Sequence, residues 1–194
     1  MDFNYVLFTE EWASLYKPMH HVPGEDSLNR RFYICDSYNN MTSFMEHMDT
    51  ECTPCVIVES QQEGNVTEGK DHPVYSFYFM VRSGSTHEGY SAYDSKREAK
   101  KVMMDFVNFV RVFKYAYEDP TYFSLLKKLP IKNDTYLSAL RAAVMNGDPC
   151  MMNLGVEDFL YETLNEMADT WYGVQMTLDD VQLYDMCADI SMYE

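Results

Sequence analysis

The segment VYSFYFMVR, at Val74–Arg82, decides the fold. Its alternation places Tyr75, Phe77, Phe79 and Val81 on one face of a strand, and Val74, Tyr78 and Met80 on the other with Ser76 and Arg82. Both faces are therefore largely apolar, which predicts a central strand of a sheet. We expect helices to cover one face, and a neighbouring segment or a partner chain to cover the other.

The next apolar pattern predicts a long helix that lies on this sheet. Asp94 or Ser95 caps its N-terminus, and the helix runs to about Tyr117. Its apolar residues recur at alternating spacings of four and three: Ala99, Met103, Phe106, Val110, Phe113 and Tyr117. Such a stripe is typical of a helix that packs on a sheet.

Shorter elements flank these two. Apolar runs predict strands at Arg31–Cys35, Cys55–Val58 and Tyr172–Asp179, whereas the polar stretch Gln61–His72, with two glycines, predicts a loop. A short helix that begins after a Thr9 cap is predicted within the opening segment 2–17, and further helices are predicted at 37–48, Thr121–Leu129 and Asp134–Met145. The last 15 residues fit a strand through Met186, Ala188, Ile190 and Met192, or a helix capped by Thr177. We favour the strand, and the helix stays open.

Together these elements predict a single α+β domain over residues 1–194. Its sheet is expected to be mainly antiparallel, with four to five strands, and to carry one long helix and several shorter helices. The segment 119–153 is expected to be a helical insertion in this domain.

Charge restricts function more than any motif does. The formal net charge is -16, and the 53 residues after Arg141 carry eleven carboxylates with no Lys or Arg. The same segment contains Trp171 and several Tyr and Met residues, so it is expected to fold while presenting a negative surface. A folded acidic surface repels nucleic acid, which argues against direct DNA or RNA binding.

Two charged surfaces are predicted from this pattern. An acidic face is expected at Asp179, Asp180, Asp185 and Asp189, and a basic patch at Lys96, Arg97, Lys100 and Lys101 on the long helix. The basic patch of one copy is expected to contact the acidic face of a neighbouring copy. Such head-to-tail contacts close into a ring when the rotation between copies permits it.

No motif indicates catalysis, a metal or a cofactor. Cys52 and Cys55 have a metal-like spacing but lack a second ligand pair, so Cys55 is expected to be a buried core residue. The pair His20-His21 is expected in a surface loop. No apolar run approaches the roughly 20 residues that span a bilayer, so we expect no membrane association. We therefore expect a non-enzymatic protein with no catalytic, metal or cofactor residues.

The order of elements resembles the tail-terminator and neck proteins of long-tailed bacteriophages. The resemblance is carried by the proline-led strand PCVIVES at Pro54–Ser60, the aromatic strand VYSFYFMVR, the following helix and the late segment WYGVQMTL at Trp171–Leu178. It covers about half of the chain. Segment Asp119–Asn153 has no counterpart in the compact members of that family, which leaves the choice among terminator, neck and connector open.

The resemblance implies a virion structural protein, assembled in the bacterial host cytoplasm. Its subunits would form a ring, commonly a hexamer, that ends the tail tube and contacts other tail or neck proteins. An acidic lumen would let DNA pass without adhesion, because it offers no cations to replace phosphate counterions. The alternative is an acidic DNA mimic that inhibits a host nucleic-acid-binding protein, with an unrecognised small hydrolase as a third hypothesis.

Overall fold

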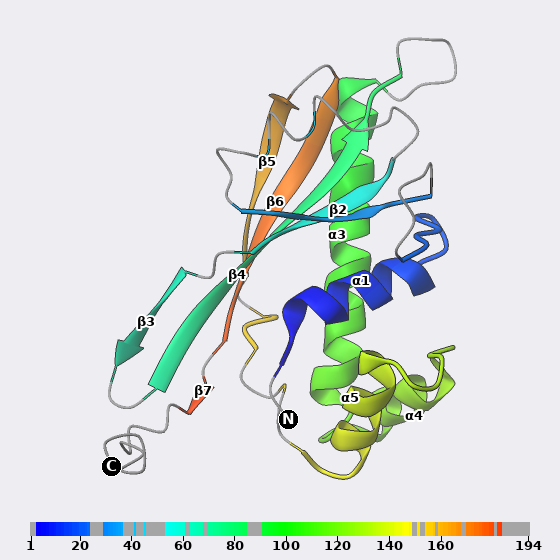
Figure 1. Cartoon of the computed structure of the whole chain (residues 1–194), viewed down its shortest axis with the longest axis vertical. Coiled ribbons are helices and arrows are strands. Elements are labelled where there is room, and N and C mark those ends of the chain that lie inside the picture. The colour runs from blue at the N-terminus through cyan, green and yellow to red at the C-terminus, as the bar shows by residue number, and fades with distance from the viewer. Residues whose placement is uncertain are drawn as a thin grey trace, which may run out of the picture.

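The computed structural model describes residues 3–23, 29–36, 41, 45, 53–60, 63–67, 70–84, 91–148, 151, 154–157, 159–167, 170–180 and 182–183. Its helices are α1 (Tyr5–Leu15), α3 (Ala92–Tyr115), α4 (Pro120–Lys128) and α5 (Tyr136–Met145). Its strands are β1 (Phe32–Cys35), β2 (Cys55–Glu59), β3 (Glu63–Thr67), β4 (Lys70–Arg82), β5 (Leu160–Met167), β6 (Trp171–Asp179) and β7 (Gln182–Leu183). The predicted α+β class is confirmed (Figure 1).

The sheet is mainly antiparallel, as expected, and one parallel pair makes it mixed. Its main path runs β1-β2-β4-β6-β5, and β3 and β7 pair with the first part of β4. The pair β1–β2 is parallel, with Phe32 opposite Val56, whereas the other pairings among the described strands are antiparallel. A parallel pair needs a crossover connection, and residues 36–54 supply enough chain for one.

Strand β4 is the centre of the sheet, as its two apolar faces predict. It pairs with β6 from Val74 opposite Asp179 to Arg82 opposite Trp171. Tyr75, Phe77, Phe79 and Val81 belong to the main core, and Tyr78 and Met80 belong to a second, smaller core. The second core also contains Met41 and Met45, so the chain itself covers part of this face. Each face of β4 thus supports a separate cluster of buried side chains.

Helix α3 lies along the main-core face against β4, β5 and β6, and its C-terminal end extends past the sheet toward α4 and α5 (Figure 1). It begins earlier than predicted, because the side chain of Ser91 accepts a hydrogen bond from the Asp94 amide and acts as the N-cap. Its buried residues include the predicted Ala99, Met103, Phe106, Val110 and Phe113. Tyr117, the predicted last position, lies after the helix and is 53% exposed.

Helix α1 packs on the same face, and its start differs from the prediction. Asn4 is the N-cap, and its side chain accepts from the Leu7 amide at 3.0 Å. The predicted cap, Thr9, is buried inside the helix, and its hydroxyl donates to the Tyr5 carbonyl at 2.7 Å. Trp12 and Phe8 from α1 stack edge-on against Phe106 of α3. Aromatic contacts therefore fix α1 to the long helix.

The segment 119–153 joins the main core. Asp119 caps α4 and Thr135 caps α5, and Leu126, Leu137, Leu140 and Val144 are buried in the same cluster as the β4 aromatics. Helix α5 ends where Gly147 adopts a φ of +89° and the Asp148 amide donates to the Ala143 carbonyl. Both helices gather beside the far end of α3 (Figure 1). The described part of this segment contains helices α4 and α5 with a non-helical connection at 129–135, and it shares the core of the sheet.

The expected loop at Gln61–His72 is wrong. Glu63–Thr67 forms β3, which pairs with β4 from Glu63 opposite Val74 to Thr67 opposite Lys70, and this hairpin projects from the sheet (Figure 1). The loop was predicted because the segment is polar. A hairpin does not need apolar side chains, because pairing between its strands satisfies the backbone amide and carbonyl groups. Of the last 15 residues, Asp180 and Gln182–Leu183 are described, and Gln182–Leu183 form strand β7. The predicted strand with alternating apolar residues from Met186 to Met192 lies outside the described residues.

Gly173 of β6 lies at a close approach between β6 and β4. A Cβ atom at this position would lie 2.8 Å from the Phe79 carbonyl oxygen and would also overlap the Met80 side chain. Because that oxygen belongs to the central strand, the overlap cannot be relieved by a rotamer change alone. Gly173→Ala is expected to lower the free energy of unfolding by about 1–3 kcal/mol, measured by urea denaturation.

Thr163→Ala provides the control for this measurement. Thr163 is an exposed residue of the neighbouring strand β5, and its substitution should change the free energy of unfolding by less than about 0.5 kcal/mol. Equal stabilities for Gly173→Ala and the parent protein would contradict the proposed close approach.

Candidate functional site

Strand β5 forms one edge of the sheet. It pairs with β6 from Leu160 opposite Thr177 to Met167 opposite Trp171, with a register irregularity between Leu164 and Met167. Within the described part of the chain, no strand pairs with its other side. An unpaired edge presents backbone donors and acceptors that another strand can use.

Large apolar side chains are exposed on this edge. Leu160 is 77% exposed and Tyr161 is 45% exposed. The register places Tyr161 on the α3 side of the sheet and Leu160 on the opposite side, because successive residues of a strand alternate. Leu164, on the same side as Leu160, is buried in the second core. Exposed apolar groups beside an open edge are typical of a protein-binding surface.

The predicted basic patch follows this edge, and the chain already uses part of it. Lys100 donates to the Tyr161 hydroxyl at 2.7 Å, with its ammonium 4.7 Å from the ring centroid. Lys96 donates to the Asn165 side chain at 3.1 Å. Lys101 contacts Glu98 at 3.4 Å, and Arg97 is exposed. Lys96 and Lys100 therefore attach α3 to β5, and Arg97 and Lys101 face outward.

The structure describes two of the four residues of the predicted acidic face, Asp179 and Asp180. Asp179 is exposed at the end of β6. Asp180 is 3% exposed, accepts from the Tyr75 hydroxyl at 3.3 Å and donates its amide to the Pro73 carbonyl. It is therefore a buried hydrogen-bonding group and not part of an acidic surface. Asp185 and Asp189 lie outside the described residues.

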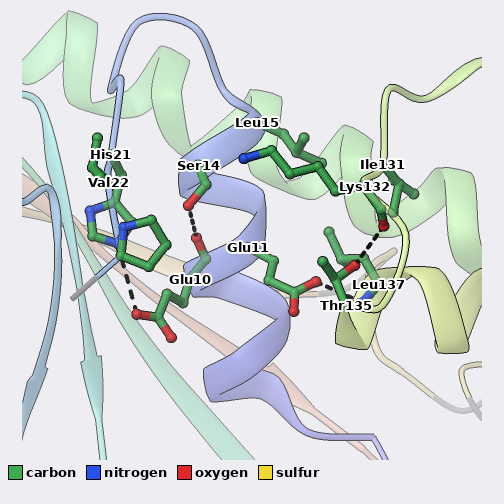
Figure 2. Close-up of a pocket in the computed structure, with 11 residues that line it drawn as sticks. Glu10, Glu11, Ser14, Leu15, His21, Val22, Ile131, Lys132, Thr135 and Leu137 are labelled. Atoms are coloured by element: carbon green, nitrogen blue, oxygen red, sulfur yellow. Dashed lines mark hydrogen bonds and ion pairs between the residues drawn. The ribbon is translucent and has the colours of Figure 1, made fainter.

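A second candidate site is a pocket of about 330 Å³ that crosses α1. Figure 2 shows α1 in the middle, with His21 and Val22 on one side and Ile131, Lys132 and Leu137 on the other. Glu10 points toward His21, and Glu11 points toward the start of α5 (Figure 2). The two adjacent carboxylates therefore have different surroundings.

Glu11 holds α5 against α1. Its carboxylate accepts hydrogen bonds from the backbone amides of Tyr136 and Leu137, both at 2.7 Å. These amides belong to the first turn of α5 and have no partner within the helix. A carboxylate at a helix N-terminus also interacts favourably with the helix dipole. Glu11 therefore has a structural role that links two segments far apart in the sequence.

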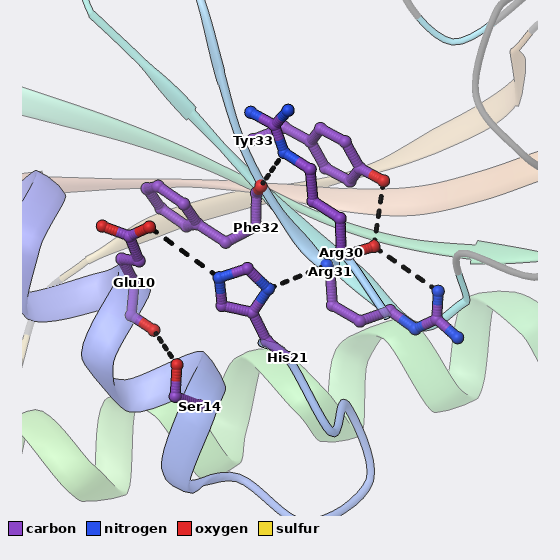
Figure 3. Close-up of polar contacts among 7 residues, drawn as sticks. All are labelled: Glu10, Ser14, His21, Arg30, Arg31, Phe32 and Tyr33. Atoms are coloured by element: carbon purple, nitrogen blue, oxygen red, sulfur yellow. Dashed lines mark hydrogen bonds and ion pairs between the residues drawn. The ribbon is translucent and has the colours of Figure 1, made fainter. Parts of the chain in front are cut away.

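His21 is buried, which corrects its predicted place in a surface loop. Its Nδ1 atom accepts from the Arg31 amide at 3.0 Å, and its Nε2 atom lies 3.8 Å from Glu10 Oε1 (Figure 3). Burial lowers the pKa of His21 to about 4, with Arg30 and Arg31 adding to the effect and the Asn29 carbonyl opposing it. The ring is therefore neutral at pH 7. Burial also raises the pKa of Glu10, as does neighbouring Glu11.

The cysteines and other metal-binding residue types give no metal site in the described part of the chain. No group of three or more His, Cys, Asp or Glu side chains comes together there. Cys55 is buried in the second core as predicted, and Cys52 lies outside the described residues. Burial raises the pKa of the Cys35 thiol to about 11, with Glu59 and Asp36 adding to it, so this thiol stays protonated. Among the described helices, none is long and apolar enough to cross a membrane.

Sequence reasoning missed three components of these sites. Strand β5 (LYETLNEM) was missed because most of its side chains are exposed and its apolar alternation is weak. Glu11 and His21 were missed because their partners lie on distant segments. The adjacent Glu10-Glu11 pair on an apolar helix was a signal that one carboxylate faces another element.

Comparisons with protein-family models, with curated proteins and with solved structures found no match for this chain. The functional conclusion therefore depends on the geometry of the chain itself and on the resemblance noted in its sequence.

The different roles of the two adjacent carboxylates lead to a matched pair of variants. Glu11→Ala removes both acceptors of the α5 amides and is expected to lower the free energy of unfolding by about 1–2 kcal/mol, as loss of a helix cap does. Glu10→Ala removes a half-buried carboxylate that accepts no hydrogen bond from the described residues, so the loss should be smaller. Urea denaturation at pH 7 measures both. Equal losses would contradict the role assigned to Glu11.

Burial of neutral His21 predicts a loss of stability in acid. Between pH 6.5 and about 4 the unfolded chain binds a proton on this ring and the folded chain does not. The free energy of unfolding should therefore fall, by up to about 3 kcal/mol, as pH drops through this window. Protonation of Glu10, whose pKa is raised, acts in the opposite direction. His21→Gln should flatten this decrease and His20→Gln, at the exposed neighbour, should retain it, both measured by urea denaturation at several pH values.

Proposed function

We propose that this chain is a non-enzymatic structural subunit of a bacteriophage tail terminator or neck, and that several copies assemble into a ring through the open edge of β5. The observation that carries this proposal is the edge strand itself, on which Leu160 is 77% exposed beside backbone groups that no described strand pairs. The bacteriophage part of the proposal is based on the sequence resemblance.

The energetics of the edge favour association with another chain. A second strand added at β5 would satisfy the backbone groups on the side that no described strand pairs, as in other cases of strand addition. Full burial of a side chain such as Leu160 contributes roughly 1.5–3 kcal/mol. The same features make an uncovered edge prone to uncontrolled pairing. A defined neighbour at this position gives the exposed edge a function.

The distribution of charge indicates which two surfaces of neighbouring copies would meet. The chain carries a net charge of -16, and Arg97 and Lys101 present exposed positive charge on α3 near this edge. An acidic surface of a neighbouring copy, with Asp179 as its described member, is complementary to these cations. Complementary charge mainly sets the register and the rate of association. A contact between two different surfaces is head-to-tail, and such contacts form a closed ring when the rotation between copies permits it.

In this proposal the ring, commonly a hexamer, ends the tail tube and contacts other tail or neck proteins in the virion. DNA passes through its lumen without binding, because acidic walls supply no cations for counterion release. No membrane or cofactor takes part.

Disruption of the β5 edge should prevent assembly. Leu160→Lys introduces a charge where burial of an apolar group is expected, so it should convert the ring into monomers. Size-exclusion chromatography with light scattering, over a range of protein concentrations, measures the mass. Leu125→Lys is the matched control, because Leu125 is 44% exposed on α4, away from the edge.

Two results would contradict this proposal. One is a parent protein that stays monomeric at all concentrations and in the presence of purified tail tubes. The other is a ring that Leu160→Lys leaves intact. Salt-sensitive inhibition of a DNA-binding enzyme by a monomer would instead support the DNA-mimic hypothesis.

A further inference from the structure

The hairpin of β3 and the start of β4 offers a second set of backbone groups for pairing. This hairpin arm comprises β3, residues 70–73 and β7, and it extends away from the helices at one end of the sheet (Figure 1). Strand β3 pairs with β4, and within the described part of the chain no strand pairs with its other side. Strand β7 adds two paired residues on the opposite side of β4. A hairpin with so few partners is only marginally stable, so a further strand on β3 would stabilise the arm.

The register of the arm determines which backbone groups of β3 face outward. Pro73 has no amide, and its carbonyl accepts from the Asp180 amide at 3.0 Å, on the side of β4 away from β3. Gly64 lies opposite Pro73, so its backbone groups do not bond to β4. Because this direction alternates along a strand, the amide and carbonyl groups of Gly64 and Val66 point to the outer side of β3.

The same alternation identifies the outward backbone groups of β5. The Asp179 carbonyl of β6 accepts from the Gly155 amide at 2.7 Å, in the segment before β5, so the odd-numbered residues of β6 direct their backbone groups toward β5. Their partners in the regular part of β5 are its even-numbered residues. The amide and carbonyl groups of Tyr161 and Thr163 therefore point away from β6, to the side that no described strand pairs.

The outward groups of the two strands match each other. An antiparallel pair between β5 of one copy and β3 of the next places Tyr161 opposite Val66 and Thr163 opposite Gly64. In each of these pairs the two residues exchange both backbone hydrogen bonds. Strand β3 has five residues and β5 has eight, so β3 fits within the length of the edge. Such strand addition satisfies the backbone groups of both copies.

Side-chain charge and the regularity of β5 favour this register over its neighbours. Glu162 is exposed on β5, and the register above places the neutral Asn65 opposite it. A shift of two residues in one direction would place Glu63 opposite Glu162, and directly opposed like charges destabilise a strand pair. A shift in the other direction would move Gly64 opposite Asn165, where the pairing of β5 is irregular. The register with Asn65 opposite Glu162 avoids both problems.

The net charges of the arm and of the β5 edge have opposite signs. Arg97 and Lys101 are exposed on α3, which packs beside β5. Residues 63–67, 70–73 and 179 carry three carboxylates and one ammonium group: Glu63, Asp71 and Asp179, with Lys70. Asp179 lies opposite Val74, where the arm joins the sheet. The arm of a neighbouring copy therefore brings negative charge to the cations beside β5.

The edge strand at the other end of the main sheet, β1, is less suited to this contact. The Arg31 carbonyl bonds to β2, so the Phe32 carbonyl faces outward, where it accepts from the Arg30 side chain at 3.3 Å. Part of this edge is thus already used within the chain. Arg30 and Arg31 also place positive charge beside β1, which would repel Arg97 and Lys101 of a neighbouring copy.

We propose that β3 of the hairpin arm of one copy adds to the open edge of β5 in the next copy, antiparallel, with Val66 opposite Tyr161 and Gly64 opposite Thr163. This inference rests on the proposed function, because it names the surface of the neighbour that covers β5 in the ring. Each copy gives its arm to one neighbour and receives the arm of the other. The contact therefore joins two different surfaces, as a ring requires.

Proline at position 66 tests the outward amide. Val66→Pro removes an N–H group that does not bond to β4, so the arm is retained, as Pro is tolerated where the N–H of an edge strand faces outward. In the ring this amide bonds to Tyr161 of the next copy. Val66→Pro should therefore raise the protein concentration at half assembly about tenfold or more, measured by light scattering. Val66→Ala keeps the amide and should change this concentration by less than about threefold, and both variants should unfold at similar urea concentrations.

A disulfide tests the register independently of the proline variant. In the proposed pairing Asn65 and Glu162 form a non-hydrogen-bonded pair, with Cα atoms about 4.5 Å apart, which a disulfide can bridge. The double variant Asn65→Cys/Glu162→Cys, oxidised in the assembled state, should therefore give disulfide-linked chains longer than a dimer on a non-reducing gel. Each single variant can link at most two copies through its new thiol. The single variants and the parent protein should not give such chains.

Two results would overturn this inference and leave the ring proposal intact. One is a Val66→Pro ring that forms at the same concentration as the Val66→Ala ring. The other is an assembled double variant that gives no linked chains longer than a dimer. A parent protein that never assembles would overturn both proposals. Assembly lost in Leu160→Lys but unchanged in Val66→Pro would assign the β5 edge to a different surface of the neighbour.

Discussion

The pairing of β4 with β6 is the constraint on which the rest of the structure depends. This pairing runs from Val74 opposite Asp179 to Arg82 opposite Trp171 and brings Gly173 against the backbone of Phe79. It places apolar side chains on both faces of β4, so two separate cores form. The main core fixes α3 and α1 on one face of the sheet. Since β6 is paired with β4 on one side and with β5 on the other, β5 becomes an edge of the sheet.

Several carboxylates of this acidic chain are used inside the structure. Glu11 accepts from the first amides of α5, Asp180 accepts from the Tyr75 hydroxyl, and Glu59 accepts from the Tyr78 hydroxyl at 2.9 Å. These contacts offset part of the repulsion that a net charge of -16 creates. Lys114 binds Glu157 at 2.9 Å and the Leu154 carbonyl at 2.6 Å, so a basic residue of α3 also holds the chain before β5. Negative charge in this protein therefore has structural uses as well as a surface role.

The sequence was sufficient where a periodic apolar pattern determined an element. Strand β4, strand β6 and helix α3 were predicted because their buried residues recur at the period of a strand or a helix. The hairpin of β3 and the edge strand β5 were missed because backbone pairing, and not an apolar face, defines them. The parallel pairing of β1 with β2 depends on the path of the connecting segment, which no local pattern specifies.

The candidate sites were less predictable for a related reason. Asp180 follows an exposed Asp179 and has the same residue type, but it lies under Tyr75, so the tertiary contact decides its burial. Likewise His20 is exposed and His21 is buried. The ring of His21 accepts a hydrogen bond from the Arg31 amide, a contact that the local sequence does not indicate. The four basic residues lie on α3, whereas the contacts of Lys96 and Lys100 with β5 required a strand that the sequence pattern did not indicate.

These features lead to one account of the molecule: helices cover one face of the sheet, no described strand covers the outer edge of β5, and we propose that another copy does so. Cryo-electron microscopy of the assembled particle tests this account most directly. The account predicts a closed ring in which the outer edge of β5, including Leu160, is covered by the adjacent subunit near Arg97 and Lys101. A ring whose subunits meet through other surfaces, with β5 exposed to solvent, would contradict it.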